Sequence, residues 1–170
     1  MSRGVHAYME RVRQPKGIRE LGMRRRRHGS CSIPHMLESA RVLVADDDPL
    51  LLPTVAEALE QFGAQVTCAA SGDELIEQLA NEGPFDLVVT DVSMPWMSGL
   101  QAMHAVRTAG LGTSVIFMTA LADERIPSQV RALGENALLL RKPFDLSQLV
   151  AAASTLLARR PTTDPSRTRP

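Results

Sequence analysis

The stretch Leu87-Val88-Val89-Thr90-Asp91 decides the fold of this sequence. Its three consecutive aliphatic residues predict a strand that is buried on both faces, which is typical of the centre of a parallel sheet. The strand ends in a single acid, Asp91, and Pro95 and Gly99 in the following segment indicate a loop. Open α/β sheets bind their ligands at the carboxyl ends of the strands. The stretch therefore predicts a carboxylate at a ligand-binding edge.

Strand and helix patterns alternate five times along the chain. The other expected strands are 41–45, 65–70, 113–120 and 137–141. The expected helices are 50–62, one that Ser71 caps with Glu74, one that opens at Ser98 or Gly99, 123–133, and one that Asp145 caps. This alternation predicts an α/β fold, in which helices cover both faces of a five-stranded parallel sheet in three layers.

Charge divides the chain into an arm and a domain. Residues 1–35 contain nine Arg or Lys and two acids, whereas residues 36–170 contain ten bases and seventeen acids. We predict a basic, disordered extension at 1–38, a folded domain at 39–159 and a disordered tail at 160–170. A nucleic-acid or anionic-lipid contact, a transit peptide and a translation start at Met36 are the alternatives for the extension.

The sequence shows neither a membrane-targeting segment nor the cysteine spacing of a metal site. The sequence has no apolar run long enough for a membrane helix and no signal-peptide core, so we expect a cytoplasmic location. Cys31 and Cys68 lie in different regions without metal-binding spacing, and we expect a loop thiol and a buried strand thiol.

Polar residues end four of the five expected strands. Because parallel strands share one carboxyl edge, these side chains should meet there. Each has an ordinary structural explanation on its own, such as a turn, a cap or a solvated lysine, but together they predict one site. They are Asp46, Asp47, Asp48, Asp91, Thr119 and Lys142.

The chemistry of this set favours phosphoryl transfer. Clustered carboxylates repel one another, and Mg²⁺ relieves the repulsion while it retains waters and accepts a phosphate oxygen. The backbone carbonyl near Ser93 could complete its shell. A lysine ammonium can pair with a phosphate and a threonine hydroxyl can donate to it. One carboxylate is then left as the nucleophile.

Residues 41–158 resemble the receiver domain of two-component response regulators. The resemblance rests on four segments, which are 42–49 (VLVADDDP), 87–95 (LVVTDVSMP) with Gly99, 117–120 (FMTA) and 142–144 (KPF). It implies a flavodoxin-like sheet with strand order 2-1-3-4-5 and five helices.

The resemblance also implies roles for single residues. Asp91 is the phosphoacceptor, Thr119 the switch hydroxyl and Lys142 the lysine that pairs with the phosphate. Mg²⁺ is held by Asp46, Asp47, Asp91 and the backbone carbonyl of Ser93. Asp48 is expected to face the loop.

The implied partners are proteins. A sensor histidine kinase or a histidine phosphotransfer protein would donate the phosphoryl group, and a downstream protein would read the face of the fourth helix, fifth strand and fifth helix. A weak homodimer is left open. We expect a stand-alone receiver that is not an enzyme and has no DNA-binding domain and no membrane segment, with a fragment of a hybrid kinase as the alternative.

One position departs from the family. The family usually carries Tyr or Phe three residues before the lysine, where this sequence has Leu139. That difference keeps open a non-phosphorylated interaction module with the same fold. A haloacid-dehalogenase phosphatase, with Asp46 as nucleophile and Asp48 as acid/base, is disfavoured because the sequence lacks a cap domain and a later acidic pair.

Overall fold

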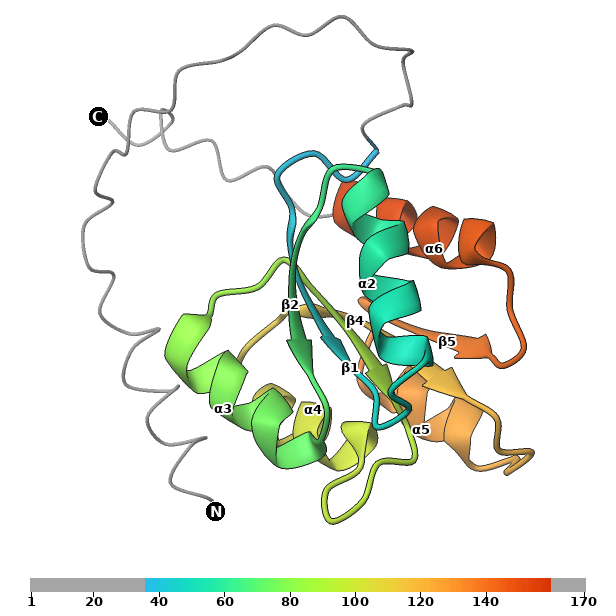
Figure 1. The fold of residues 1–170 in the computed structure, drawn as a ribbon. Coiled ribbons are helices and arrows are strands. Elements are labelled where there is room, and N and C mark those ends of the chain that lie inside the picture. Colours follow the sequence, from blue (N-terminus) through green and yellow to red (C-terminus); the bar gives the residue numbers. More distant parts are fainter. Residues whose placement is uncertain (1–35, 160–170) are drawn as a thin grey trace, which may run out of the picture.

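The computed structural model describes residues 36–159, and Figure 1 shows them as a sheet covered on both sides by helices. The predictions for residues 1–35 and 160–170 lie outside the described residues. The strands are β1 (Arg41–Ala45), β2 (Gln65–Ala69), β3 (Leu87–Asp91), β4 (Ser114–Thr119) and β5 (Ala137–Arg141). The helices are α2 (Leu51–Gln61), α3 (Gly72–Glu82), α4 (Gly99–Thr108), α5 (Ile126–Ala132) and α6 (Leu146–Ala158).

The five strands are parallel and lie in the order β2-β1-β3-β4-β5. This arrangement confirms the predicted flavodoxin-like fold. The strand β3 lies in the middle and all five of its residues are buried. Since every strand runs in the same direction, the segments after Ala45, Asp91, Thr119 and Arg141 all leave from one edge of the sheet. We call this the carboxyl edge.

Alternation along the strands builds two apolar layers. Val42, Val44 and Val89 face the layer that contains α2 and α6, whereas Leu43 and Val88 face the layer that contains α3, α4 and α5. Figure 1 shows the same division of the helices between the two faces of the sheet. The period of two residues along a strand explains this division, since successive side chains point to opposite faces.

The packed chain begins earlier than the predicted boundary at residue 39. Leu37 is buried in the layer of α2 and α6, and its backbone N–H donates to the carbonyl of Phe62 at 3.1 Å. The packed chain therefore reaches into the last two residues of the segment that we expected as an extension, 1–38. Leu37 follows Met36 and precedes Glu38 and Ser39, and no helical or strand period in this segment marks it as core.

The helix predicted at 123–133 is shorter in the structure, where α5 spans Ile126–Ala132. Asp123 instead closes a turn, in which its carboxylate accepts from the backbone N–H of Arg125 at 2.8 Å. Pro127 lies in the first turn of α5, where no N–H is needed. The expected burial of Cys68 is also wrong, because this thiol is exposed on the edge strand β2.

The predicted helix caps position the loops of the carboxyl edge. The Ser71 hydroxyl accepts from the N–H of Glu74 at 3.2 Å, and the Glu74 carboxylate accepts from the N–H of Ala70 at 2.7 Å. Ser98 and Gln101 form a reciprocal capping box at the start of α4. In the part of the chain that the structure describes, no helix is long and apolar enough to cross a membrane.

Candidate functional site at the carboxyl edge

Asp91 ends the central strand as a buried carboxylate. It is 5% exposed, and its Oδ2 atom accepts a hydrogen bond of 2.6 Å from the backbone N–H of Ser93. The N–H of Val92 donates to the carbonyl of Met118, so the neighbouring strand fixes the chain just past Asp91. The sheet and the loop together hold this side chain at the carboxyl edge.

Lys142 links two strand ends. Its Nζ atom lies 2.7 Å from Asp91 Oδ1 and 2.8 Å from Asp46 Oδ2. Asp46 follows β1 and Lys142 follows β5, so one ammonium joins residues 96 positions apart in the sequence. The peptide bond between Lys142 and Pro143 is cis. Three of the predicted site residues therefore meet at one point.

The three consecutive acids after β1 have different surroundings. Asp46 is buried, and its Oδ1 atom accepts from the N–H of Asp48 at 2.9 Å. Asp48 Oδ1 accepts from the N–H groups of Leu50 and Leu51 at 2.9 and 3.3 Å, so Asp48 caps the start of α2. Asp47 is exposed. The expectation that Asp48 faces the loop agrees with this capping contact.

Thr119 is buried at the end of β4, beside the Asp91 strand. Its hydroxyl oxygen accepts from the N–H of Leu121 at 3.0 Å, and its carbonyl accepts from the N–H of Lys142 at 2.8 Å. The threonine thus ties the β4–α5 loop to the strand end that carries Lys142.

Glycine at position 99 allows the close approach of α4 to the site. A Cβ atom on Gly99 would overlap the carbonyl of Asp91 and the Thr90 side chain. The Thr90 hydroxyl itself donates to the Asp91 carbonyl at 3.1 Å. The sequence pattern predicts Gly99 only as a helix opener, because this steric role depends on distances between elements.

The site contains more acidic than basic side chains. Burial alone would lower the pKa of Lys142, but its hydrogen bonds to Asp46 and Asp91 and the charges of both outweigh burial and raise that pKa above its ordinary value. The ammonium is therefore charged at neutral pH. Two buried carboxylates share this single positive charge, and the exposed Asp47 adds a third negative charge next in sequence.

This donor set fits a small divalent cation. An excess of negative charge in a buried site is unfavourable, and oxygen ligands suit Mg²⁺. Among residues 36–159, no three acidic, histidine or cysteine side chains gather into a metal-binding group. Mg²⁺ does not need such a cage, because it usually binds one or two carboxylates and keeps several waters.

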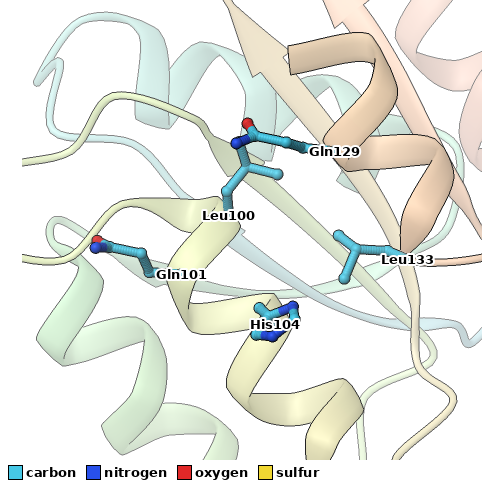
Figure 2. Close-up of a pocket in the computed structure, with 5 residues that line it drawn as sticks. All are labelled: Leu100, Gln101, His104, Gln129 and Leu133. Atoms are coloured by element: carbon cyan, nitrogen blue, oxygen red, sulfur yellow. The ribbon is translucent and has the colours of Figure 1, made fainter. Parts of the chain in front are cut away.

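A separate hollow lies between α4 and α5 (Figure 2) and has a volume of about 290 Å³. None of the predicted site residues lines it, so it is distinct from the carboxyl-edge site. Its lining residues are Leu100, Gln101, His104, Gln129 and Leu133.

Comparison with known proteins identifies the family. The model of the response regulator receiver domain matches residues 42–154. The chain belongs to the response regulator receiver family. This receiver is 38% identical over 112 residues to the transcriptional regulatory protein CrdR of Helicobacter pylori, covering 65% of this chain and 52% of that protein. It is 36% identical to the probable transcriptional regulatory protein TcrX of Mycobacterium tuberculosis, covering 69% and 50%.

Solved structures agree with this family. The receiver domain of Francisella response regulator 1452 has a TM-score of 0.65 and 27% identity, and the match covers 71% of this chain and 98% of that one. The chemotaxis response regulator CheY4 of Vibrio cholerae has a TM-score of 0.61 and 29% identity, with 69% and 98% covered. The receiver therefore aligns with whole receiver structures, whereas it spans about half the length of the curated relatives it matches.

Proposed function

We propose that this receiver accepts a phosphoryl group on Asp91 from the phosphohistidine of a sensor histidine kinase or a phosphotransfer protein. The observation that carries the proposal is the pairing of the buried Asp91 with Lys142 at the edge where parallel sheets bind ligands. Receiver domains are signalling domains of two-component systems, and this chain belongs to that family.

The reaction needs a carboxylate held in place and charge neutralisation around it. An Asp91 oxygen forms a bond to phosphorus while the bond from phosphorus to the donor's imidazole nitrogen breaks, and its electron pair stays on that nitrogen. The Ser93 N–H orients the carboxylate, and the Lys142 ammonium stabilises the negative charge that gathers on the phosphoryl oxygens.

The proposed reaction also requires Mg²⁺. Asp46, Asp47, Asp91 and the backbone carbonyl of Ser93 would hold Mg²⁺, which would neutralise charge on the phosphoryl group. Asp46 and Asp91 are already adjacent through Lys142, and Asp47 is exposed beside them.

The signal would pass through Thr119. A phosphoryl group on Asp91 adds charge and acceptor oxygens beside the end of β4. If the Thr119 hydroxyl turns to donate to it, the N–H of Leu121 loses its acceptor and the β4–α5 loop changes conformation. The face formed by α5, β5 and α6 would then present different contacts to a downstream protein. Leu139, which stands on β5 where the family usually has an aromatic residue, packs partly buried against the core on the α5 side.

The experiment uses a small phosphodonor. Wild type, Asp91→Asn and Asp73→Asn are incubated with phosphoramidate and Mg²⁺, and the phosphorylated fraction is measured by intact-protein mass spectrometry. Asp73 is an exposed acid on α3 and serves as the matched control. We expect labelling of wild type and Asp73→Asn only, and loss of labelling when EDTA removes Mg²⁺. Equal labelling of Asp91→Asn would overturn the proposal.

A further inference from the structure

Large apolar side chains are exposed around the site. Within residues 36–159, five such side chains are exposed, and four of them follow the carboxyl ends of strands. We call these four the apolar rim, and they are Leu50, Trp96, Leu121 and Leu146. The fifth, Met36, precedes β1 and lies at the opposite edge.

Trp96 is the most exposed residue of the apolar rim. Its side chain is 97% exposed, and its φ of +64° lies in the left-handed region that side chains other than glycine, asparagine and aspartate rarely adopt. The N–H of Met97 donates to the carbonyl of Pro95 at 2.7 Å, so the chain makes a three-residue turn with Trp96 at its centre. A strained turn thus presents the largest apolar side chain to solvent.

Both flanks of this turn are anchored. Met94 is buried, and Met97 packs against the core between α3 and α4. A Cβ atom on Gly72 would overlap the Met97 backbone, so α3 also contacts the turn closely. Trp96 is therefore displayed from a fixed backbone two residues before α4 begins at the capped Ser98.

We propose that Trp96 is a specificity-determining contact for a protein phosphodonor and inserts into an apolar surface beside the donor's phosphohistidine. This inference rests on the proposed function of Asp91. A donor protein must bring its phosphorus to within bonding distance of Asp91, which lies five residues before Trp96, so its surface must cover this edge. A small phosphodonor would leave the rim exposed to water. Buried tryptophans are frequent hot spots of protein interfaces.

The test separates docking from chemistry. Two labelling rates are measured for each variant, one with phosphoramidate and one with a phosphohistidine protein. The protein donor is the autophosphorylated histidine kinase or phosphotransfer protein of the source organism that labels wild type fastest in a purified panel. The variants are Trp96→Asn, Trp96→Phe and, as a matched exposed apolar control, Met36→Asn.

We expect the ratio of the protein-donor rate to the phosphoramidate rate to fall about tenfold or more in Trp96→Asn, as for loss of an interface hot spot. Trp96→Phe should lose less, and Met36→Asn should keep the wild-type ratio. Trp96 is the only tryptophan of the chain, so its emission should also shift to the blue when the donor binds.

The remaining outcomes distinguish failure of the inference about Trp96 from failure of the proposed function. An unchanged ratio in Trp96→Asn overturns the inference while phosphoramidate labelling still supports the proposed function. Labelling by phosphoramidate but by no protein of the panel also overturns it, as does a blue shift that depends only on the concentration of this chain, which would indicate a second copy on the rim. Absence of phosphoramidate labelling would instead contradict the proposed function itself.

Discussion

The Lys142 ammonium lies 2.7 Å from Asp91 Oδ1 and holds the Asp46 carboxylate at nearly the same distance. The cation that follows β5 thus joins the carboxylate that follows β1 and the carboxylate that ends β3, across the carboxyl edge. Both acids are buried, whereas the lysine is partly exposed. The same contact stabilises the folded chain and places a positive charge where a phosphoryl group would arrive.

Replacing Lys142 tests the structural part of this contact. Lys142→Met leaves two buried carboxylates without their counter-ion, and we expect the free energy of unfolding to fall by about 1–3 kcal/mol. Because a cation can replace the ammonium, Mg²⁺ should stabilise Lys142→Met more than wild type. Urea unfolding with Mg²⁺ and with EDTA measures both effects. Equal free energies of unfolding of the two proteins in EDTA would show that the Lys142 contact contributes nothing to stability.

The pH dependence of this contact follows from the direction of the shift. Since folding raises the pKa of Lys142, its contribution is fully present below its unfolded pKa of about 10.4 and is lost as pH rises through the higher folded value. The stability difference between wild type and Lys142→Met should therefore stay constant from about pH 6 to 9 and shrink above about pH 10.5. A difference that shrinks between pH 7 and 9 would contradict the raised pKa.

Gly99 and Gly112 form a matched pair of substitutions. Gly99→Ala forces a methyl group into the Asp91 carbonyl and the Thr90 side chain, and we expect a loss of about 1–3 kcal/mol together with slower phosphoramidate labelling. Gly112→Ala meets nothing within 4 Å and should leave the labelling rate unchanged. Urea midpoints and labelling rates measure the two effects. Similar behaviour of both variants would refute the close approach of α4.

Relief of strain at Trp96 should raise stability. Trp96→Gly removes the side chain from a left-handed backbone position, and we expect the unfolding free energy to increase by about 1 kcal/mol. Trp96→Phe keeps the strain and should be close to wild type. Thermal and urea unfolding of the three proteins provide the comparison. A destabilised Trp96→Gly would mean that the indole makes contacts that stabilise the folded chain.

The sequence predicts those parts of the receiver that depend on local pattern. Short apolar runs predict the strands, and parallel strands place Asp46, Asp91, Thr119 and Lys142 at one edge without any knowledge of distances. The features it misses depend on tertiary contacts. Leu37 has no periodic neighbours, and the overlap that forbids a side chain at Gly99 arises only when α4 meets β3.

Local turn chemistry explains the other differences. Asp123 could open a helix, but its carboxylate binds the N–H of Arg125 two residues later, so α5 begins only at Ile126. The strained turn at Trp96 has no propensity signal, because tryptophan is a poor residue for positive φ. The sequence feature that could have drawn attention to this turn is a tryptophan between Pro95 and Met97, in a loop beside the site.

We propose that Asp91, and no other acid, receives the phosphoryl group. Wild type treated with phosphoramidate and Mg²⁺ is reduced with borohydride, which converts a phosphorylated aspartate into homoserine, and the modified residue is located by peptide mass spectrometry. We expect homoserine at position 91 alone. Homoserine at position 46 or 48, or none at all, would contradict it.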